Sequence, residues 1–252
     1  MTDKILLEID ADGIGVLTFN RPEARNALDI EAMTTFADTI SAIDARVLIV
    51  TGAGKQAFCS GADLIEMSER PTETDAAEMI ALMGDALLAL ERLPIPVVAA
   101  INGYALGGGA EVALACDLRI IDAAGKLGFV QAKRGVIPGW GGGQRLLRLV
   151  GYARALDLLL RAPILPPEEL LALGLVSSIA PAGGALEAAR AWAAQVARLD
   201  PAVVRSMKAL LQTGLTQPYD DALAAERALF PPLWVGKARI NSTREFLERR
   251  GT

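Results

Sequence analysis

The residues best suited to chemistry lie at 107–111, where three glycines precede a glutamate. Gly107, Gly108 and Gly109 lead into a helix-forming run at 110–116, whose first turn carries Glu111. The first N–H groups of a helix have no intrahelical partner, and glycine places no side chain over them. We therefore expect a backbone donor for a carbonyl oxygen beside a carboxylate that moves a proton, a pairing suited to enolate chemistry.

A second stretch has the features of another donor loop. Ser60, Gly61 and Ala62 precede Asp63, which is suited to begin a helix. Taken alone, each glycine stretch is more simply explained by close packing or by a surface loop, since short glycine patterns are common. Neither a phosphate loop nor a dinucleotide fingerprint is present. Two such loops after buried strands of one sheet favour a pocket with two donors for one oxygen.

Composition excludes several other kinds of site. The 252 residues are 52% apolar, which suits one large domain or a domain with an appendage. The net charge of −5 argues against binding nucleic acid through a basic patch. The sequence contains no histidine, which excludes Ser-His-Asp and Cys-His nucleophiles and histidine-based metal sites. We therefore expect neither a metal nor a nucleic-acid partner.

The sequence also indicates a compartment. Cys59 and Cys116 are far apart in apolar surroundings, as expected of core residues in a reducing environment. The N-terminal residues lack the apolar segment of a signal peptide, and no apolar run approaches the length of a membrane span. We expect a soluble, cytoplasmic protein without a membrane partner.

Strands and helices must position the two glycine loops. Apolar runs rich in β-branched residues predict strands at 5–9, 14–19, 47–51, 97–101, 119–121, 126–130 and 176–179. Apolar periodicity and composition predict helices after a cap at Asp29 and at 76–93, 144–150, 153–160, 168–173, 186–199, 201–212 and 219–229, with a last helix around Phe246 and Leu247. We place a boundary at 199/200, giving a core at 1–199 and a helical region at 200–252 that packs on the core or on another subunit.

The segment 131–143 is rich in glycine and carries Trp140. Such a loop is a poor core element, so we expect it to line a pocket or an interface.

These pieces, taken in order, resemble a known family over nearly the whole chain. The matching stretches are Asn20–Pro22 with Asn26–Leu28, Ala57–Leu64, Asn102–Glu111, Ile137–Pro138–Gly139 with Gly141–Gly142, and Phe246–Arg250. The chain resembles the crotonase (enoyl-CoA hydratase/isomerase) superfamily. The resemblance implies an α/β fold that is a spiral of β-β-α turns, with a C-terminal helical region that builds homotrimers or hexamers. It also implies an acyl-CoA thioester substrate, whose coenzyme A is part of the substrate, and no cofactor.

The resemblance also implies roles for individual residues. The backbone amides of Ala62 and Gly108 would form the oxyanion hole, and Glu111 falls on the first of the family's two catalytic glutamates. Contacts with the substrate and its coenzyme A would come from Arg25, Ala27, Asp63, Leu64 and Trp140.

Two positions depart from the family's pattern. The second catalytic glutamate precedes Ile137–Pro138–Gly139 by a fixed spacing, and that spacing leads to Gln131. Glutamine neither accepts nor delivers a proton at neutral pH, so the change argues against ordinary hydration and isomerisation. We expect the Gln131 amide to face a carboxylate of the substrate. Ile65 stands where the family often has lysine, which weakens one phosphate contact.

The segment 129–142 looks most like the ethylmalonyl-CoA decarboxylase branch, which also lacks the second glutamate and carries Trp-Gly-Gly. Loss of CO₂ from a malonyl-type thioester leaves an enolate directly, so one carboxylic acid is enough to complete the reaction. We therefore expect an acyl-CoA lyase that decarboxylates a substituted malonyl-CoA.

Other functions stay open at this point. The first is an enoyl-CoA hydratase in which Glu111 acts with another acid, the nearest candidates in sequence being Glu66 and Glu69. A second is a non-catalytic relative that binds coenzyme A or RNA, against which the acidic balance and the intact Ala62, Gly108 and Glu111 argue. A serine protease on the same fold is the third, and the absence of histidine argues against it.

Overall fold

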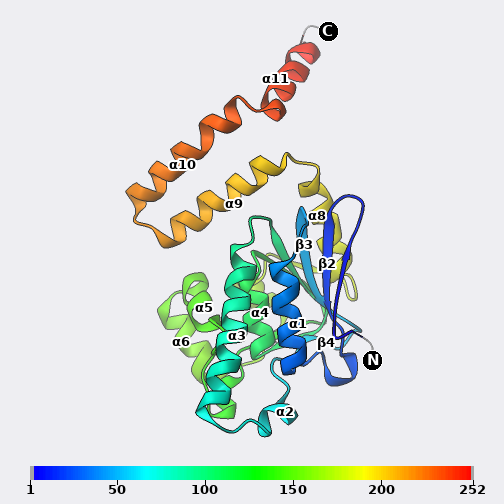
Figure 1. The fold of residues 1–252 in the computed structure, drawn as a ribbon, viewed down its shortest axis with the longest axis vertical. Coiled ribbons are helices and arrows are strands. Elements are labelled where there is room, and N and C mark those ends of the chain that lie inside the picture. Colours follow the sequence, from blue (N-terminus) through cyan, green and yellow to red (C-terminus); the bar gives the residue numbers. More distant parts are fainter. Residues whose placement is uncertain (1–2, 251–252) are drawn as a thin grey trace.

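A six-stranded sheet forms the body of the protein in the computed structural model, which describes residues 3–250 (Figure 1). β1 (Ile5–Ile9) pairs antiparallel with β2 (Ile14–Phe19), and the parallel strands β3, β5, β7 and β9 follow in that order. Their bounds are Val47–Gly52, Val97–Ile101, Leu118–Asp122 and Ser178–Ala180. The apolar runs of β3 and β5 are wholly buried because helices cover both faces of the sheet.

Alternating side chains of β3 show the two faces. Leu48 and Val50 join the core under α1 (Ile30–Ser41) and α3 (Glu73–Arg92), whereas Val47 and Ile49 face α8 (Ala185–Ala197). α8 approaches closely because it presents a stripe of alanines to the sheet, at 185, 189, 193 and 197. Among the described residues, no helix is long and apolar enough to cross a membrane.

A second, smaller sheet positions the two glycine loops. It consists of β4 (Ala57–Cys59), β6 (Tyr104–Leu106) and β8 (Lys126–Gly128), which pair in parallel in that order. Each follows one strand of the large sheet along the chain, so the chain winds as a spiral of strand, strand and helix. Because neighbouring parallel strands end at the same edge, the segments after β4, β6 and β8 meet there. These segments contain residues 60–62, residues 107–109 and Gln131.

Most of the predicted elements are present, and several bounds were wrong. β4 and β6 were not predicted, because three residues are too short to show a strand period. α3 begins at Glu73 instead of 76, because Thr72 and Asp75 form a capping box. The predicted strand at 126–130 ends at Gly128, where the chain turns into the 3₁₀ helix η2 (Gln131–Arg134), and the strand at 176–179 lies at Ser178–Ala180.

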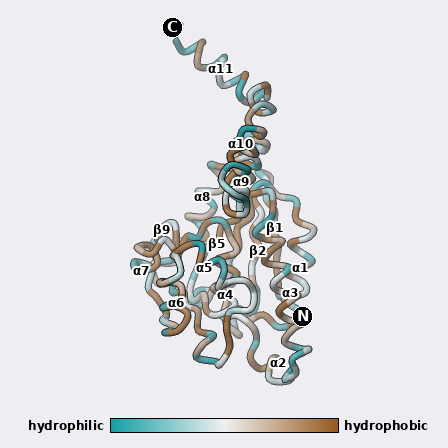
Figure 2. Tube along the Cα trace, turned by 90° about the vertical axis from the view of Figure 1, so that its left-hand side faces the viewer, coloured by the Kyte–Doolittle hydropathy of each residue, from teal (hydrophilic) through white to brown (hydrophobic). Residues whose placement is uncertain are grey.

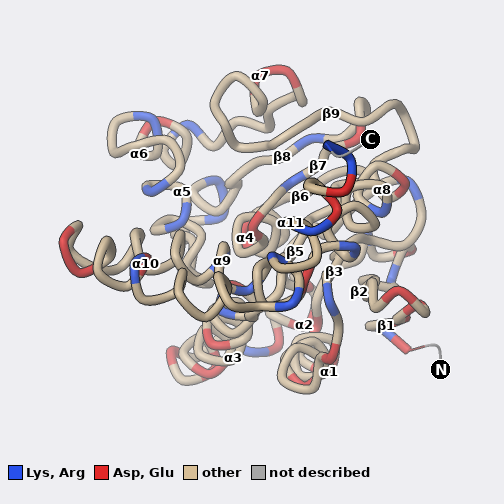
Figure 3. Tube along the Cα trace, turned by 90° about the horizontal axis from the view of Figure 1, so that it is seen from above, with Lys and Arg blue, Asp and Glu red and all other residues tan. Residues whose placement is uncertain are grey.

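Three helices follow the body, α9 (Pro201–Thr216), α10 (Tyr219–Trp234) and α11 (Lys237–Arg250). α9 runs across one end of the body and contacts it, and α10 and α11 extend away from the body (Figures 1 and 2). The predicted end of α10 at 229 was wrong, since the helix continues through Pro231 and Pro232 while its apolar side packs on α9. In α11, basic and acidic residues are interspersed (Figure 3). The division expected at 199/200 falls between α8 and α9 and stays a prediction.

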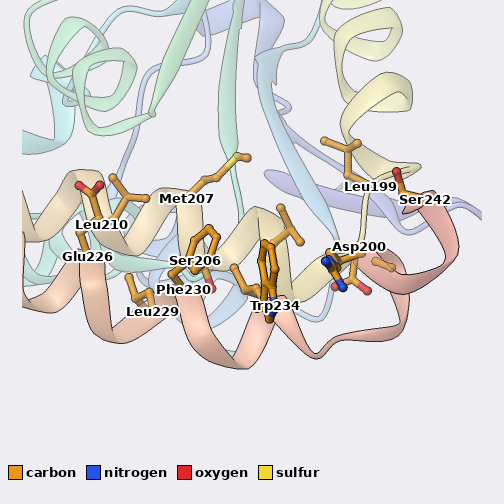
Figure 4. A pocket seen from close by; sticks show the side chains of 14 residues that line it. Leu199, Asp200, Ser206, Met207, Leu210, Glu226, Leu229, Phe230, Trp234 and Ser242 are labelled. Carbon is orange, nitrogen blue, oxygen red and sulfur yellow. The ribbon is translucent and has the colours of Figure 1, made fainter. Parts of the chain in front are cut away.

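The C-terminal helices leave a large apolar surface uncovered. A groove of about 560 Å³ runs along α9 and α10, lined by Met207, Leu210, Leu229, Phe230 and Trp234 (Figure 4). Phe230 is 59% exposed and Trp234 is 51% exposed. Large exposed apolar surfaces mark places where proteins associate.

We predict that the 252-residue chain associates with copies of itself, because association would cover this apolar surface, and the family resemblance makes a trimer or hexamer the expected assembly. Sedimentation equilibrium should give a mass near three or six times the 26.5 kDa of one chain. A monomer that persists at micromolar concentration would contradict the prediction.

Candidate functional site

The two glycine loops touch each other at the edge of the small sheet. Gly61 has a φ of +93°, and a Cβ added to it would lie 2.9 Å from the backbone nitrogen of Gly108. A Cβ on Gly109 would overlap the carbonyl of Cys59 in β4. Close packing therefore explains why Gly61 and Gly109 are glycines, which is the simpler interpretation given above for each stretch on its own. The same packing brings the two loops together.

Two backbone donors on these loops are unpaired. In the described part of the chain, neither the Ala62 amide nor the Gly108 amide donates to a protein acceptor. The residues on either side of Ala62 are held by a parallel β-bridge to Leu28. The Leu28 amide donates to the Gly61 carbonyl at 2.9 Å, and the Leu28 carbonyl accepts from the Asp63 amide at 2.8 Å. Gly108 is the first residue of α4 (Gly108–Ala115), where helical N–H groups lack partners. Both residues are half-buried, so the two donors sit on adjacent, fixed loops.

Glu111 lies buried in α4, with only 2% of its surface exposed. Its Oε2 accepts hydrogen bonds from the amides of Trp140 and Gly142, each at 2.8 Å, and its Oε1 accepts from Nε2 of Gln131 at 2.9 Å. Burial raises the pKa of Glu111, and these three donors, with a smaller contribution from the backbone of Gly139, oppose that shift without cancelling it. The carboxyl group is therefore fixed in place and holds its proton more strongly than an exposed glutamate does.

The structure brings Gln131 to Glu111 from η2, which follows β8. Nε2 of Gln131 donates one of its two hydrogens to Glu111, so its second hydrogen is left for a substrate carboxylate, and that expected contact stays a prediction. The Oε1 of Gln131 is buried and has no partner among the described residues.

Trp140 is buried in the hydrophobic core with 4% of its surface exposed, whereas residues 132–137 of the same loop are exposed. The expectation that the loop is a poor core element was therefore wrong for Trp140 itself. Its indole packs on Gly108, where an added Cβ would overlap the ring, and its Nε1 lies 3.1 Å from Sδ of Met79 in α3. Trp140 thus supports the first residue of α4. A larger residue at 108, such as valine, would therefore displace the Trp140 ring as well as cover the Gly108 amide.

The expected coenzyme A contacts lie on loops beside the donors. Arg25 is exposed in a left-handed conformation, Leu64 is 56% exposed, and Ala27 is buried. Asp63 has a structural role, because Oδ1 caps α2 (Leu64–Ser68) at the Ile65 amide and Oδ2 lies 2.9 Å from Nη1 of Arg21, and its contact with the substrate stays a prediction. Arg25 and Leu64 are therefore the predicted contacts whose side chains reach the surface.

Glu66 and Glu69, the acids considered as replacements for the missing second glutamate, make no hydrogen bond with Glu111 among the described residues. Oε2 of Glu66 accepts from the Ile30 amide at 2.8 Å, so this carboxylate caps α1. Glu69 is exposed at the end of α2. Neither side chain contacts Glu111, and Gln131 is the side chain that shares a hydrogen bond with it.

Sequence reasoning did not single out Asn26 and Arg21 as the residues that lock the first loop. Asn26 is buried with φ of 56°, and its Nδ2 donates to the carbonyls of Ala53 and Ala57 at 3.0 and 2.7 Å. Its Oδ1 accepts from the Arg21 amide at 3.0 Å. The signal was available, since both residues stand in the motif at 20–28.

The cysteines offer no second chemistry, because burial raises the pKa of Cys59 and Cys116 to about 12. Within residues 3–250, no group of three or more cysteine and carboxylate side chains is arranged to hold a metal ion.

Comparison with known proteins identifies the family. The sequence model described as enoyl-CoA hydratase/isomerase matches residues 10–252. The chain belongs to this family. An ethylmalonyl-CoA decarboxylase from Gallus gallus is 36% identical over 245 residues, which cover 94% of this chain and 82% of that protein. A short-chain-enoyl-CoA hydratase from Clostridium acetobutylicum is 34% identical over 253 residues, which cover 98% of this chain and 96% of that protein.

The crotonase fold is also shown by solved structures. The crystal structure of an enoyl-CoA hydratase from Bacillus anthracis superposes with a TM-score of 0.93 at 32% identity, covering 98% of this chain and 97% of that one. The protein is thus an enzyme of the crotonase superfamily, and its relatives carry the names of two different reactions.

We predict that Gly142→Ala will abolish most activity while Gly143→Ala will not. A Cβ at Gly142 would overlap Cγ of Glu111, whereas a Cβ at Gly143 would have Leu159 as its nearest neighbour, 4.0 Å away. Both glycines lie in α5 (Gly142–Val150), so each substitution gains roughly 0.5–1 kcal/mol in helix propensity. We expect kcat to fall by about 10²-fold for Gly142→Ala. Equal activity of the two variants, measured with thermal melts, would show that the position of Glu111 is not critical.

Proposed function

We propose that the protein is an acyl-CoA lyase that decarboxylates a substituted malonyl-CoA. The observation that carries the proposal is the pairing of one buried carboxylate, Glu111, with an amide, Gln131, beside two unpaired backbone donors. The ethylmalonyl-CoA decarboxylases among the relatives support the same reaction.

In this proposal the thioester oxygen of the substrate binds the amides of Ala62 and Gly108. The bond between the α-carbon and the substrate carboxylate breaks, CO₂ leaves, and its electron pair becomes the thioester enolate. The two amides stabilise the negative charge that develops on the oxygen. Protonated Glu111 then donates its proton to the α-carbon, giving the shortened acyl-CoA, and recovers a proton from water.

The surroundings of Glu111 suit an acid that starts protonated. Burial raises its pKa, which increases the protonated fraction near neutral pH. The amide of Gln131 donates to the ionised carboxylate, and after rotation its unpaired Oε1 can accept from the protonated form. A neutral residue at 131 also avoids repulsion of the substrate carboxylate, which a glutamate there would cause.

Hydration of an enoyl-CoA is the second candidate, favoured by the hydratases among the relatives. Hydration needs an acid and a base that act on one water molecule and one carbon atom. In the pair of Glu111 and Gln131, only Glu111 is a carboxylate, and the carboxylate of Glu66 is used to cap α1. In both reactions we propose that coenzyme A contacts Arg25 and Leu64, with no separate cofactor.

We predict opposite pH profiles for the two reactions. A decarboxylase uses protonated Glu111, so its kcat should fall as pH rises through the raised pKa of Glu111. A hydratase that uses ionised Glu111 should instead lose activity as pH falls through that pKa. The pH dependence of kcat on malonyl-type thioesters should be measured for wild type and for Glu111→Gln. The part of the wild-type profile that is absent from the variant is the part due to Glu111.

The variant Glu111→Gln should lower kcat by about 10²–10⁴-fold. Its melting temperature should change little at neutral pH, because the new carbonyl can accept from Trp140 and Gly142 and the new amide can donate to Oε1 of Gln131. A raised pKa stabilises the fold below the unfolded pKa of about 4.3, and that stability is lost as pH rises through the folded pKa. Because glutamine does not ionise, the stability of Glu111→Gln should not show this decrease with rising pH. Retained activity with a lower melting temperature would assign Glu111 a structural role.

We predict that Gln131→Glu will reverse the substrate preference. Wild type should decarboxylate methyl- or ethylmalonyl-CoA and hydrate crotonyl-CoA poorly. The variant should hydrate crotonyl-CoA faster, by up to about 10²–10⁴-fold, because it gains a second proton-transfer group, and should lose decarboxylation.

Gln195→Glu makes the same charge change on the exposed surface of α8 and should alter neither rate. Wild-type hydration of crotonyl-CoA at about 10–10³ s⁻¹ would overturn the decarboxylase proposal.

A further inference from the structure

Arg145 stands behind the loop that holds Glu111. This residue belongs to α5, and only 10% of its side chain is exposed. Its Nη1 donates to the carbonyl of Trp140 at 2.8 Å, and its Nε donates to Oε2 of Glu91, at the end of α3, at 2.7 Å. Gly141 makes room for the guanidinium, since a Cβ there would lie 2.7 Å from Nη1 and φ is +89°.

The loop has contacts on both sides. On one side, the amides of Trp140 and Gly142 donate to Oε2 of Glu111. On the other side, the carbonyl of Trp140 accepts from Arg145. The Trp140 carbonyl belongs to the peptide unit between 140 and 141, which joins the two units that carry the Trp140 and Gly142 amides. Because peptide units are planar, the two amides turn relative to this carbonyl only through the φ and ψ angles of Trp140 and Gly141.

Glu91 is itself fixed from a third direction. Its backbone carbonyl accepts from Nε2 of Gln212 in α9 at 2.6 Å, and Nη1 of Arg148 lies 3.7 Å from its Oε1. The anchor of Arg145 is therefore held by both the body and the first C-terminal helix. A half-buried ion pair is weak evidence for stability by itself, because desolvation offsets the attraction between the charges.

We propose that Arg145 is a positioning residue that acts through the Trp140 carbonyl to align the two amides that hold Glu111. The inference rests on the proposed function only in that Glu111 moves a proton, and it holds for decarboxylation and for hydration. Its distinctive consequence is a loss of turnover without a loss of substrate binding.

The test uses Arg145→Ala in the full-length chain. We expect kcat to fall by about 10²-fold, the effect of displacing a reacting group by roughly 1 Å, while KM stays within about twofold. Arg145 lines a cavity of about 490 Å³ between α9 and the body, so added guanidinium ion can reach the vacated position and should restore part of kcat. Guanidinium should not restore Glu111→Gln, which lacks the acid itself.

Arg148→Ala is the matched control, because Arg148 also approaches Glu91 but is 46% exposed and does not contact the loop. Its kcat should stay within about twofold of wild type. If Arg145→Ala does not fold, Glu91→Gln tests the same anchor, and we expect a smaller fall in kcat with KM again unchanged.

Two outcomes would overturn the proposal. One is a folded Arg145→Ala, or in its place a folded Glu91→Gln, with wild-type kcat. The other is a fall in kcat that guanidinium does not reverse and that Arg148→Ala shares. The test is run on whichever thioester the wild type turns over, with Glu111→Gln as reference. A wild type that only hydrates enoyl-CoA refutes the decarboxylase function and leaves this result unchanged.

Discussion

The burial of the Glu111 carboxylate is the constraint on which the site depends. A carboxylate removed from water is unfavourable unless hydrogen-bond donors replace the solvent, and here three donors surround it. Two are backbone amides of a glycine-rich loop, and the third is the amide of Gln131. Gly142 has no side chain because Glu111 occupies the space where one would lie.

The same packing explains the position of the unpaired amide proposed to bind the thioester oxygen. Helix α4 starts close to β4 because Gly109 carries no Cβ against the Cys59 carbonyl. The first turn is supported from the other side by the indole of Trp140. The amide of Gly108 and the carboxylate of Glu111 therefore belong to one rigid turn, and the loop at 139–142 contacts both. An enzyme that stabilises an enolate gains from such rigidity, because donors fixed in advance need no reorganisation during the reaction.

Replacing a carboxylate with an amide at 131 changes what this arrangement can do. Two carboxylates side by side can share the work of an acid and a base, whereas a carboxylate with an amide has one group that transfers a proton. Loss of CO₂ needs only that group, because the departing CO₂ leaves its electrons on the substrate. The amide also matches either protonation state of Glu111, as a donor or as an acceptor.

The sequence alone determined the buried strands, most helices and the two donor loops, because apolar runs and glycines act locally. Its resemblance to a known family also pointed to Gly108, Glu111 and Gln131, whose catalytic roles stay predictions. Only the tertiary structure decided what each side chain contacts. Trp140 was expected to line a pocket, yet it lies in the core, because its amide and ring both find partners from distant segments. Glu66 and Asp63 were available in sequence as functional carboxylates, but the fold uses them to cap α1 and to join Arg21. The short strands β4 and β6 carry no period, and their parallel pairing, which brings residues 60–62 beside 107–109, is a long-range contact that no local pattern encodes.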